Sequence, residues 1–198
     1  MGVLDDMRQA TARGGATFAF AFVLGWAGSA VAEPRRYAID PEHFSIVFAV
    51  DHCGCAPTGG MFLRAEGGFT FDEEARTLSD LVVAVDPASV FTNHERRDEH
   101  LRAADFLDVA NHPEARFVMT GAEPTGERTG RVTGDLTLRG VTRPVTLDVT
   151  WNKSGPYPFG PNYVIGITAT TTIRRSDFGM TYAVENGWVG DEVPLTFD

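Results

Sequence analysis

Residues 145–151, VTLDVTW, decide the fold, because apolar and polar side chains alternate along them without interruption. Val145, Leu147, Val149 and Trp151 share one face of an extended chain, and threonine and aspartate occupy the other face. Alternation with a period of two residues is typical of a β-strand with one buried face. The stretch therefore predicts an amphipathic strand on which Trp151 points to the interior.

The same period-two pattern recurs along the chain after residue 33. Alternating segments lie at residues 46–50, 69–71, 81–85, 117–119, 132–138, 165–173 and 193–197. Turn-forming residues separate them at 57–60, 72–76, 125–130, 139–140 and 154–161. Eight or nine short strands at hairpin spacing predict one all-β domain, an antiparallel barrel or sandwich.

One segment departs from the strand pattern. Residues 98–109, DEHLRAADFLDV, contain neither proline nor glycine and carry apolar Leu101, Ala104 and Leu107 at helical spacing. The segment stops before Pro113, and proline disfavours helix in the residue that precedes it. We therefore expect a single helix over residues 98–109.

The first 32 residues resemble a leader rather than a folded segment. Arg8 and Arg13 precede the apolar run 16–27, and the small residues Ala30-Val31-Ala32 follow before Glu33. This order predicts a secretory signal peptide over residues 1–32, and hence a periplasmic or secreted domain over residues 33–198. A membrane anchor is the alternative, because nineteen uncharged residues separate Arg13 from Glu33.

The net charge and the absence of several motifs exclude some classes of function. Seventeen basic residues against 27 acidic ones give a net charge of −10, the opposite of what nucleic-acid binding requires. Phosphate-binding glycine loops, serine-hydrolase elbows and the H-E-x-x-H zinc motif are all absent from the sequence. The 14 phenylalanines and three tryptophans either fill the core or line an apolar cavity, because a small barrel can do both.

Two groups of polar residues are candidate functional sites. His52, Cys53 and Cys55 combine imidazole with two thiols, which fits a soft metal, a redox or dimer contact, or no role beyond packing. Arg97 and His100, three residues apart in the expected helix, form either a solvated helix start or a polar gate at a cavity mouth.

Four stretches in order resemble the YceI-like proteins. They are YAIDPEHFSIVFAVDH at 37–52, RDEHLRAADF at 97–106 with Pro113 and Phe117 after it, GDLTLRGVTRPVTL at 134–147, and ATTTIRRSDFGM at 169–180. Two positions depart from the family pattern: Phe44 separates His43 from Ser45, and Cys53 stands where an aliphatic residue is usual.

The resemblance implies an extended, eight-stranded, antiparallel lipocalin-like β-barrel with one helix covering an opening. It implies a binding protein rather than an enzyme, with no cofactor apart from a bound lipid: a polyisoprenoid, an isoprenoid quinone or a fatty-acid derivative in an internal tunnel. Association with membrane electron-transfer proteins and a homodimer also remain open, as does a periplasmic redox or metal-binding module using His52, Cys53 and Cys55.

On this reading the ligand is held by aromatic walls and a polar headgroup site. We expect Arg97 and His100 to contact the headgroup. The expected wall residues are Phe48, Phe69, Phe106, Phe117, Trp151 and Phe178.

Overall fold

The computed structural model describes residues 33–198, so the expected signal peptide 1–32 lies outside the described residues. The strands are β1 (Arg35–Ala38), β2 (Ile46–His52), β3 (Ala56–Phe62), β4 (Ala65–Asp72), β5 (Thr77–Val85), β6 (Val90–Phe91), β7 (Ala115–Pro124), β8 (Thr129–Leu138), β9 (Val141–Pro156), β10 (Tyr163–Arg174) and β11 (Glu192–Phe197). The helices are α1 (Glu95–Arg102) and two 3₁₀ turns, η1 (Pro87–Ser89) and η2 (Arg175–Phe178).

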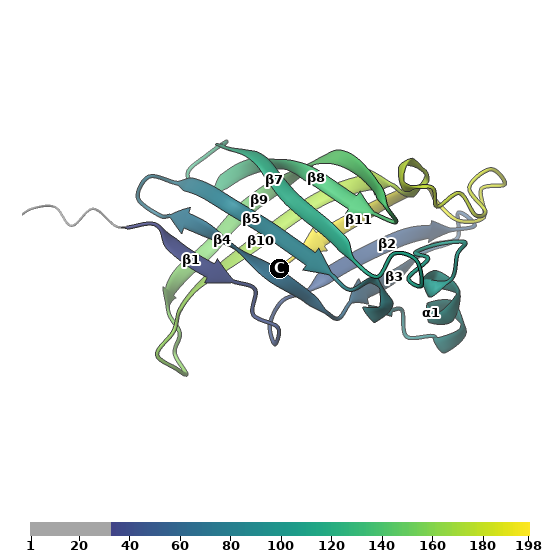
Figure 1. The fold of residues 1–198 in the computed structure, drawn as a ribbon, viewed down its shortest axis with the longest axis horizontal. Helices are drawn as coiled ribbons and strands as arrows, with labels where there is room; N and C mark the ends of the chain where they lie inside the picture. The colour runs from purple at the N-terminus through teal and green to yellow at the C-terminus, as the bar shows by residue number, and fades with distance from the viewer. Residues whose placement is uncertain (1–32) are drawn as a thin grey trace, which may run out of the picture. The chain divides into compact units, whose positions relative to one another are not determined.

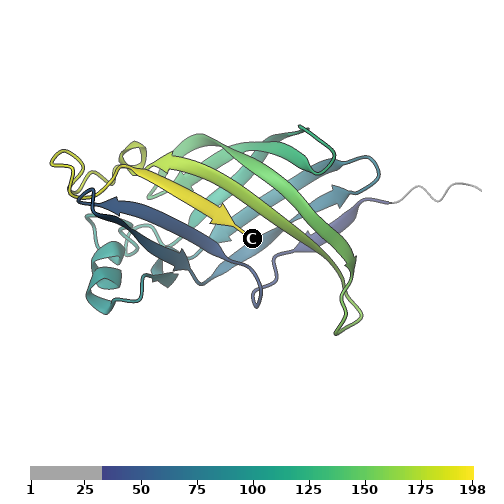
Figure 2. The same cartoon turned by 180° about the vertical axis from the view of Figure 1, so that it is seen from behind.

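All eleven strands belong to one antiparallel sheet that curls into a barrel-like wall. Their order is β1-β4-β5-β7-β8-β9-β10-β11-β2-β3-β6. Figure 1 shows the strands wrapping around a common interior, with α1 at one end and the β9–β10 turn at the other, and Figure 2 shows the same arrangement from behind. The expected all-β, lipocalin-like architecture with one helix at an opening is confirmed.

The expected number of eight strands is wrong, because the sheet contains eleven. Two of the strands that sequence patterning missed, β1 and β6, are only four and two residues long and form the two edges. The third, β3, contains residues 57–60, which were expected to form a turn. Glycine is required at Gly60, since a Cβ there would lie 2.4 Å from the Phe48 ring.

The expected helix over residues 98–109 is also wrong in its bounds, because the observed helix begins and ends earlier in the chain. Helix α1 begins after His94, whose Nδ1 accepts a hydrogen bond from the Arg97 amide, and it ends at Arg102. The chain then folds back, and the Leu107 amide donates to the Leu101 carbonyl at 2.9 Å. This reversal turns Phe106 and Leu107 into the interior, where both are buried.

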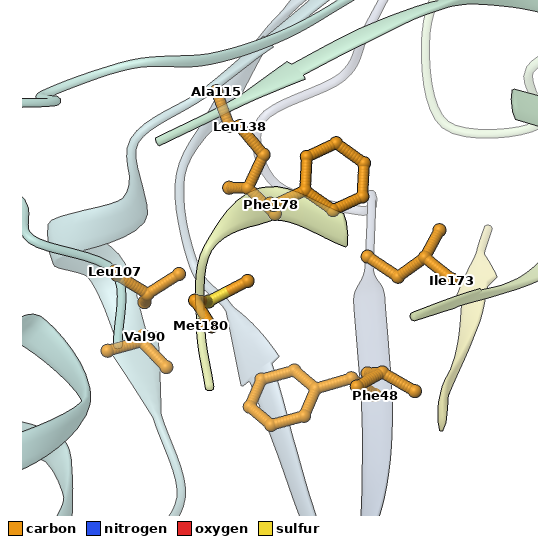
Figure 3. Close-up of a cluster of buried hydrophobic side chains, with 9 residues drawn as sticks. Phe48, Val90, Leu107, Ala115, Leu138, Ile173, Phe178 and Met180 are labelled. Atoms are coloured by element: carbon orange, nitrogen blue, oxygen red, sulfur yellow. The ribbon is translucent and has the colours of Figure 1, made fainter. Parts of the chain in front are cut away.

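The buried side chains form two clusters along the barrel. The cluster near α1, shown in Figure 3, contains Phe48, Val90, Leu107, Ala115, Leu138, Ile173, Phe178, Met180 and Val193. The second cluster contains Phe117, Val132, Leu147 and Ala169. Val145 packs against both clusters, and Val149 packs against the second. The period-two prediction for residues 145–149 is therefore confirmed.

Candidate functional site

A cavity of about 460 Å³ opens among the side chains of the first cluster. Strand β2 contributes Ile46, Phe48 and Val50 to its wall, and β8 contributes Leu136 and Leu138. Most of the remaining wall is aliphatic or aromatic. The volume lies within the range of about 300–1,000 Å³ that is usual for ligand pockets, which are also mainly apolar.

Polar side chains enter the cavity wall at one end only. They are Asp51, His52, Cys53, Thr58, Thr92, Arg97, His100, Arg175 and Tyr182. They come from the end of β2, the start of β3, the residue after β6, helix α1, the start of η2 and the segment 179–191, and these elements lie toward the right-hand end of Figure 1. We call this end of the cavity the mouth.

Arg97 is held at the mouth by Thr92, which lies three residues before the start of α1. Its Nε donates to the Thr92 hydroxyl at 2.7 Å, and its Nη2 donates to the Thr92 carbonyl at 2.6 Å. The buried carboxylate of Asp98 accepts hydrogen bonds from the amide and the hydroxyl of Thr92. The guanidinium is thus oriented at the cavity wall by a network of three residues.

His100 belongs to a group of three rings at the same end. Its ring centre lies 4.9 Å from that of Phe106 and 5.0 Å from that of Tyr182, and both pairs are edge-to-face. Its Nε2 lies 3.0 Å from the Asp105 carboxylate. The imidazole is therefore fixed between two aromatic rings while it lines the cavity.

A second arginine, Arg175, is buried beside these rings with 3% of its surface exposed. Its guanidinium donates to four backbone carbonyls, those of Met180, Tyr182, Val189 and Gly190, at 2.7–2.8 Å. Burial lowers the pKa of this guanidinium from its usual value, while the nearby Asp191 acts in the opposite direction. Arg175 therefore organises the segment 179–191 into one side of the mouth.

The comparisons with known proteins agree with this architecture. The model of the YceI-like domain family matches residues 37–198. A UPF0312 protein of Pseudomonas savastanoi is 42% identical over 167 residues, which cover 83% of this chain and 85% of that protein. The chain belongs to the YceI-like family.

Solved structures resemble this YceI-like domain in fold. BcnA of Burkholderia cenocepacia matches with a TM-score of 0.70 and 23% identity over 80% of this chain and 96% of that one. The Campylobacter jejuni YCEI protein matches with a TM-score of 0.65 and 27% identity, covering 74% and 85%. A polyisoprenoid binding domain from Saccharophagus degradans matches with a TM-score of 0.58 and 15% identity, covering 83% and 96%.

Four of the eight expected ligand-contact residues of the YceI-like domain line the cavity: Phe48, Arg97, His100 and Phe106. The other four do not. Phe178 packs in the first cluster behind the wall, and Phe117 lies in the second cluster. Phe69 stacks on Tyr37 at 5.3 Å.

Trp151 is also away from the cavity. Its ring meets Phe71 edge-to-face at 5.5 Å, and its indole nitrogen is buried without a hydrogen-bond partner among residues 33–198. Alternation groups residues that share a face of a strand, leaves the inward face ambiguous by one residue, and carries no information on which level of the barrel is hollow. Sequence reasoning also missed Arg175 and Tyr182, for which no local pattern provides a signal.

The two thiols of the YceI-like domain lie at the mouth in the turn between β2 and β3. Both are free and exposed. The Cys53 amide donates to the Trp188 carbonyl at 2.9 Å, and the Cys53 thiol lies 3.5 Å from the same oxygen. His52 and Cys53 line the cavity, whereas Cys55 does not. Within residues 33–198, no group of three or more histidine, cysteine or acidic side chains assembles to hold a metal.

A second polar cluster joins elements at the opposite end of the barrel. The Glu73 carboxylate accepts hydrogen bonds from the hydroxyls of Tyr37 at 3.1 Å, Ser154 at 2.6 Å and Tyr163 at 3.3 Å. Burial acts to raise the pKa of Glu73, but these donors outweigh burial and hold it below its usual value. Burial and the adjacent carboxylate raise the pKa of Tyr37 to about 12.

No helix within residues 33–198 has the length and apolar character needed to cross a membrane.

Proposed function

We propose that this YceI-like domain is a binding protein that sequesters or carries one long amphiphilic molecule. The candidates are a polyisoprenoid, an isoprenoid quinone and a fatty-acid derivative. The observation that carries the proposal is the cavity of about 460 Å³, whose walls are apolar and whose polar groups gather at one end. The likeness in fold to a polyisoprenoid binding domain also supports it.

The apolar part of such a ligand supplies the affinity. Burial contributes about 0.8 kcal/mol per CH₂ group, and association costs several kcal/mol of that gross gain. A chain of roughly a dozen carbons therefore binds without any polar contact. Contacts at the mouth then determine which end of the ligand enters first.

The headgroup faces the mouth in this proposal. Arg97 and His100 line the cavity there, and each is held in place by neighbouring side chains. Tyr182 adds a phenol to the same wall. Hydrogen-bond donors at the end of an apolar cavity, among them the Arg97 guanidinium, favour a headgroup that accepts hydrogen bonds, such as a carboxylate, a phosphate or a quinone carbonyl.

We propose export as the setting of this activity. The charged, apolar and small-residue segments of residues 1–32 support cleavage before Glu33. N-terminal sequencing of the periplasmic or secreted protein is expected to begin at Glu33. A membrane-bound product that begins at Met1 would contradict export by cleavage and favour the anchor.

No catalytic step and no cofactor other than the bound lipid enter this proposal. The metal-binding form of the alternative is less well supported, because within residues 33–198 His52, Cys53 and Cys55 do not form a three-ligand group. The redox form remains a prediction from the sequence. A homodimer and an association with membrane electron-transfer proteins remain predictions from the sequence.

The binding experiment compares two substitutions on one strand. Val50 lines the cavity, whereas Val47 is exposed on the outer face of β2. Titration of delipidated protein with a fluorescent long-chain fatty acid is expected to show one saturable site in the wild type. Val50→Trp should reduce the stoichiometry or affinity, and Val47→Trp should leave both unchanged. Equal binding by all three proteins would contradict a ligand inside the cavity.

A further inference from the structure

Two exposed aromatic side chains border the mouth of the cavity. Trp188 has 61% of its surface exposed and Tyr182 has 46%, although both also line the cavity. Each ring therefore has one side toward the cavity and another toward solvent. Tryptophan and tyrosine rings are suited to an interface at which one side is apolar and the other is wet.

The segment that carries these rings is nearly uncharged and firmly held. Residues 179–190, GMTYAVENGWVG, contain a single charged side chain, Glu185, in a chain whose net charge is −10. Arg175 binds four carbonyls of the segment, and the amides of Cys53 and Gly190 add hydrogen bonds between it and the end of β2. Exposure of Trp188 is thus imposed by an ordered backbone.

We propose that the mouth docks on a phospholipid bilayer, with Trp188 and Tyr182 inserted among the lipid headgroups. Amphipathic tryptophan and tyrosine rings prefer this interfacial layer, where one side is apolar and the other is wet. The cavity would then open directly onto the bilayer, so that a lipid passes between them without crossing water. This inference rests on the proposed function, because docking on a membrane can supply a lipid only if the cavity binds one.

The charge of the chain restricts the kind of bilayer. Because the net charge is −10, the docked protein is repelled by anionic lipid headgroups. We therefore expect binding to vesicles of zwitterionic phosphatidylcholine, and weaker binding when anionic phosphatidylglycerol is added. An electrostatic mode of docking would show the opposite dependence.

The chain provides its own control at the other end of the barrel. Phe159 in the β9–β10 turn is 87% exposed, but it does not line the cavity. Figure 1 shows this turn far from α1 and from the segment that follows η2. Non-specific adsorption through exposed aromatic rings would make Phe159 as important as Trp188, whereas docking by the mouth depends on Trp188 and not on Phe159.

The test measures partitioning of the purified chain into phosphatidylcholine vesicles by flotation. Trp188→Ser removes one aromatic side chain from the bilayer interface, so its partition coefficient is expected to fall at least about tenfold. Phe159→Ser should match the wild type. All three proteins share the same N-terminus, so a difference arises within residues 33–198. Equal partitioning by Trp188→Ser and wild type, or an equal loss in Phe159→Ser, would overturn the proposal.

Fluorescence provides a second readout with the same vesicles. Phospholipids brominated on their acyl chains are expected to quench wild-type emission, and the quenching should be weaker in Trp188→Phe, since Trp26 and Trp151 are present in both proteins. Fatty-acid binding by the wild type is measured separately, without vesicles. Vesicle docking and ligand binding are thus scored separately: absence of vesicle partitioning by the wild type overturns docking, and absence of ligand binding overturns the proposed function.

Discussion

Replacement of Arg175 by methionine is expected to loosen the wall of the cavity mouth. Methionine retains much of the apolar stem but removes the guanidinium that binds the carbonyls of Met180, Tyr182, Val189 and Gly190. Because three of these four residues also line the cavity, the substitution affects stability and ligand binding together.

The magnitude follows from two opposing contributions. Hydrogen bonds to a charged donor contribute about 1.5–3 kcal/mol each, and Arg175 makes four of them at 2.7–2.8 Å. The cost of removing the cation from water, several kcal/mol in folded proteins, offsets much of that gain. We expect a net loss of about 3–5 kcal/mol in the free energy of unfolding, a large share of the roughly 5–15 kcal/mol that stabilises a domain.

The neighbouring arginine is the matched control. Arg174 is exposed and pairs with the Asp191 carboxylate at 2.9 Å, and solvent screens such pairs. Urea unfolding followed by far-UV circular dichroism should show a much smaller loss for Arg174→Met. Arg175→Lys, which keeps the charge but not the planar fork, should fall between the two.

Hydrogen exchange locates the effect. Amides of residues 179–191 should lose protection in Arg175→Met before those of β8 and β9 do, because the guanidinium holds that segment. Equal unfolding free energies for Arg174→Met and Arg175→Met, with unchanged protection of the segment, would refute the reasoning.

Three further outcomes are expected. Spectrophotometric titration should find Tyr37 ionising near pH 12. Its raised pKa stabilises the folded state fully below pH 10, and this contribution is lost as the pH rises toward 12. A titration with no ionisation near pH 12 would contradict this expectation. Gly134→Ala should lower the free energy of unfolding by about 1–3 kcal/mol without changing ligand affinity, because the new Cβ would lie 2.4 Å from the Phe117 ring. Replacement of Cys53 and Cys55 by serine should preserve folding and fatty-acid binding, and loss of a dimer on non-reducing gels or of stoichiometric metal would favour the redox alternative.

The strands were largely predictable, because burial of one face of a strand makes apolar and polar residues alternate along the sequence. Residues 145–149 illustrate this: Val145, Leu147 and Val149, predicted to share one face, pack in the buried clusters. β3 was not recognised because the Gly59-Gly60 pair normally indicates a turn, whereas here Gly60 lies in the strand, where a Cβ would meet the Phe48 ring.

The site was only partly predictable. Arg97 and His100 were found because helical spacing places them on one side of α1, and both line the cavity. Trp151 faces inward as expected but lies beyond the hollow part of the barrel, since the position of a cavity along the axis depends on packing between distant strands. Arg175 depends entirely on carbonyls that the fold brings to it, so adjacent arginines in the sequence do not distinguish it from Arg174.

Native mass spectrometry of gently purified protein tests the central claim most directly. The binding proposal predicts one additional mass per chain in the range of a long-chain amphiphile, removed by delipidation and restored at one molecule per chain by an added long-chain fatty acid. Restoration should fail in Val50→Trp and succeed in Val47→Trp. A wild-type chain that carries no such molecule and takes up none after delipidation would contradict the proposed function.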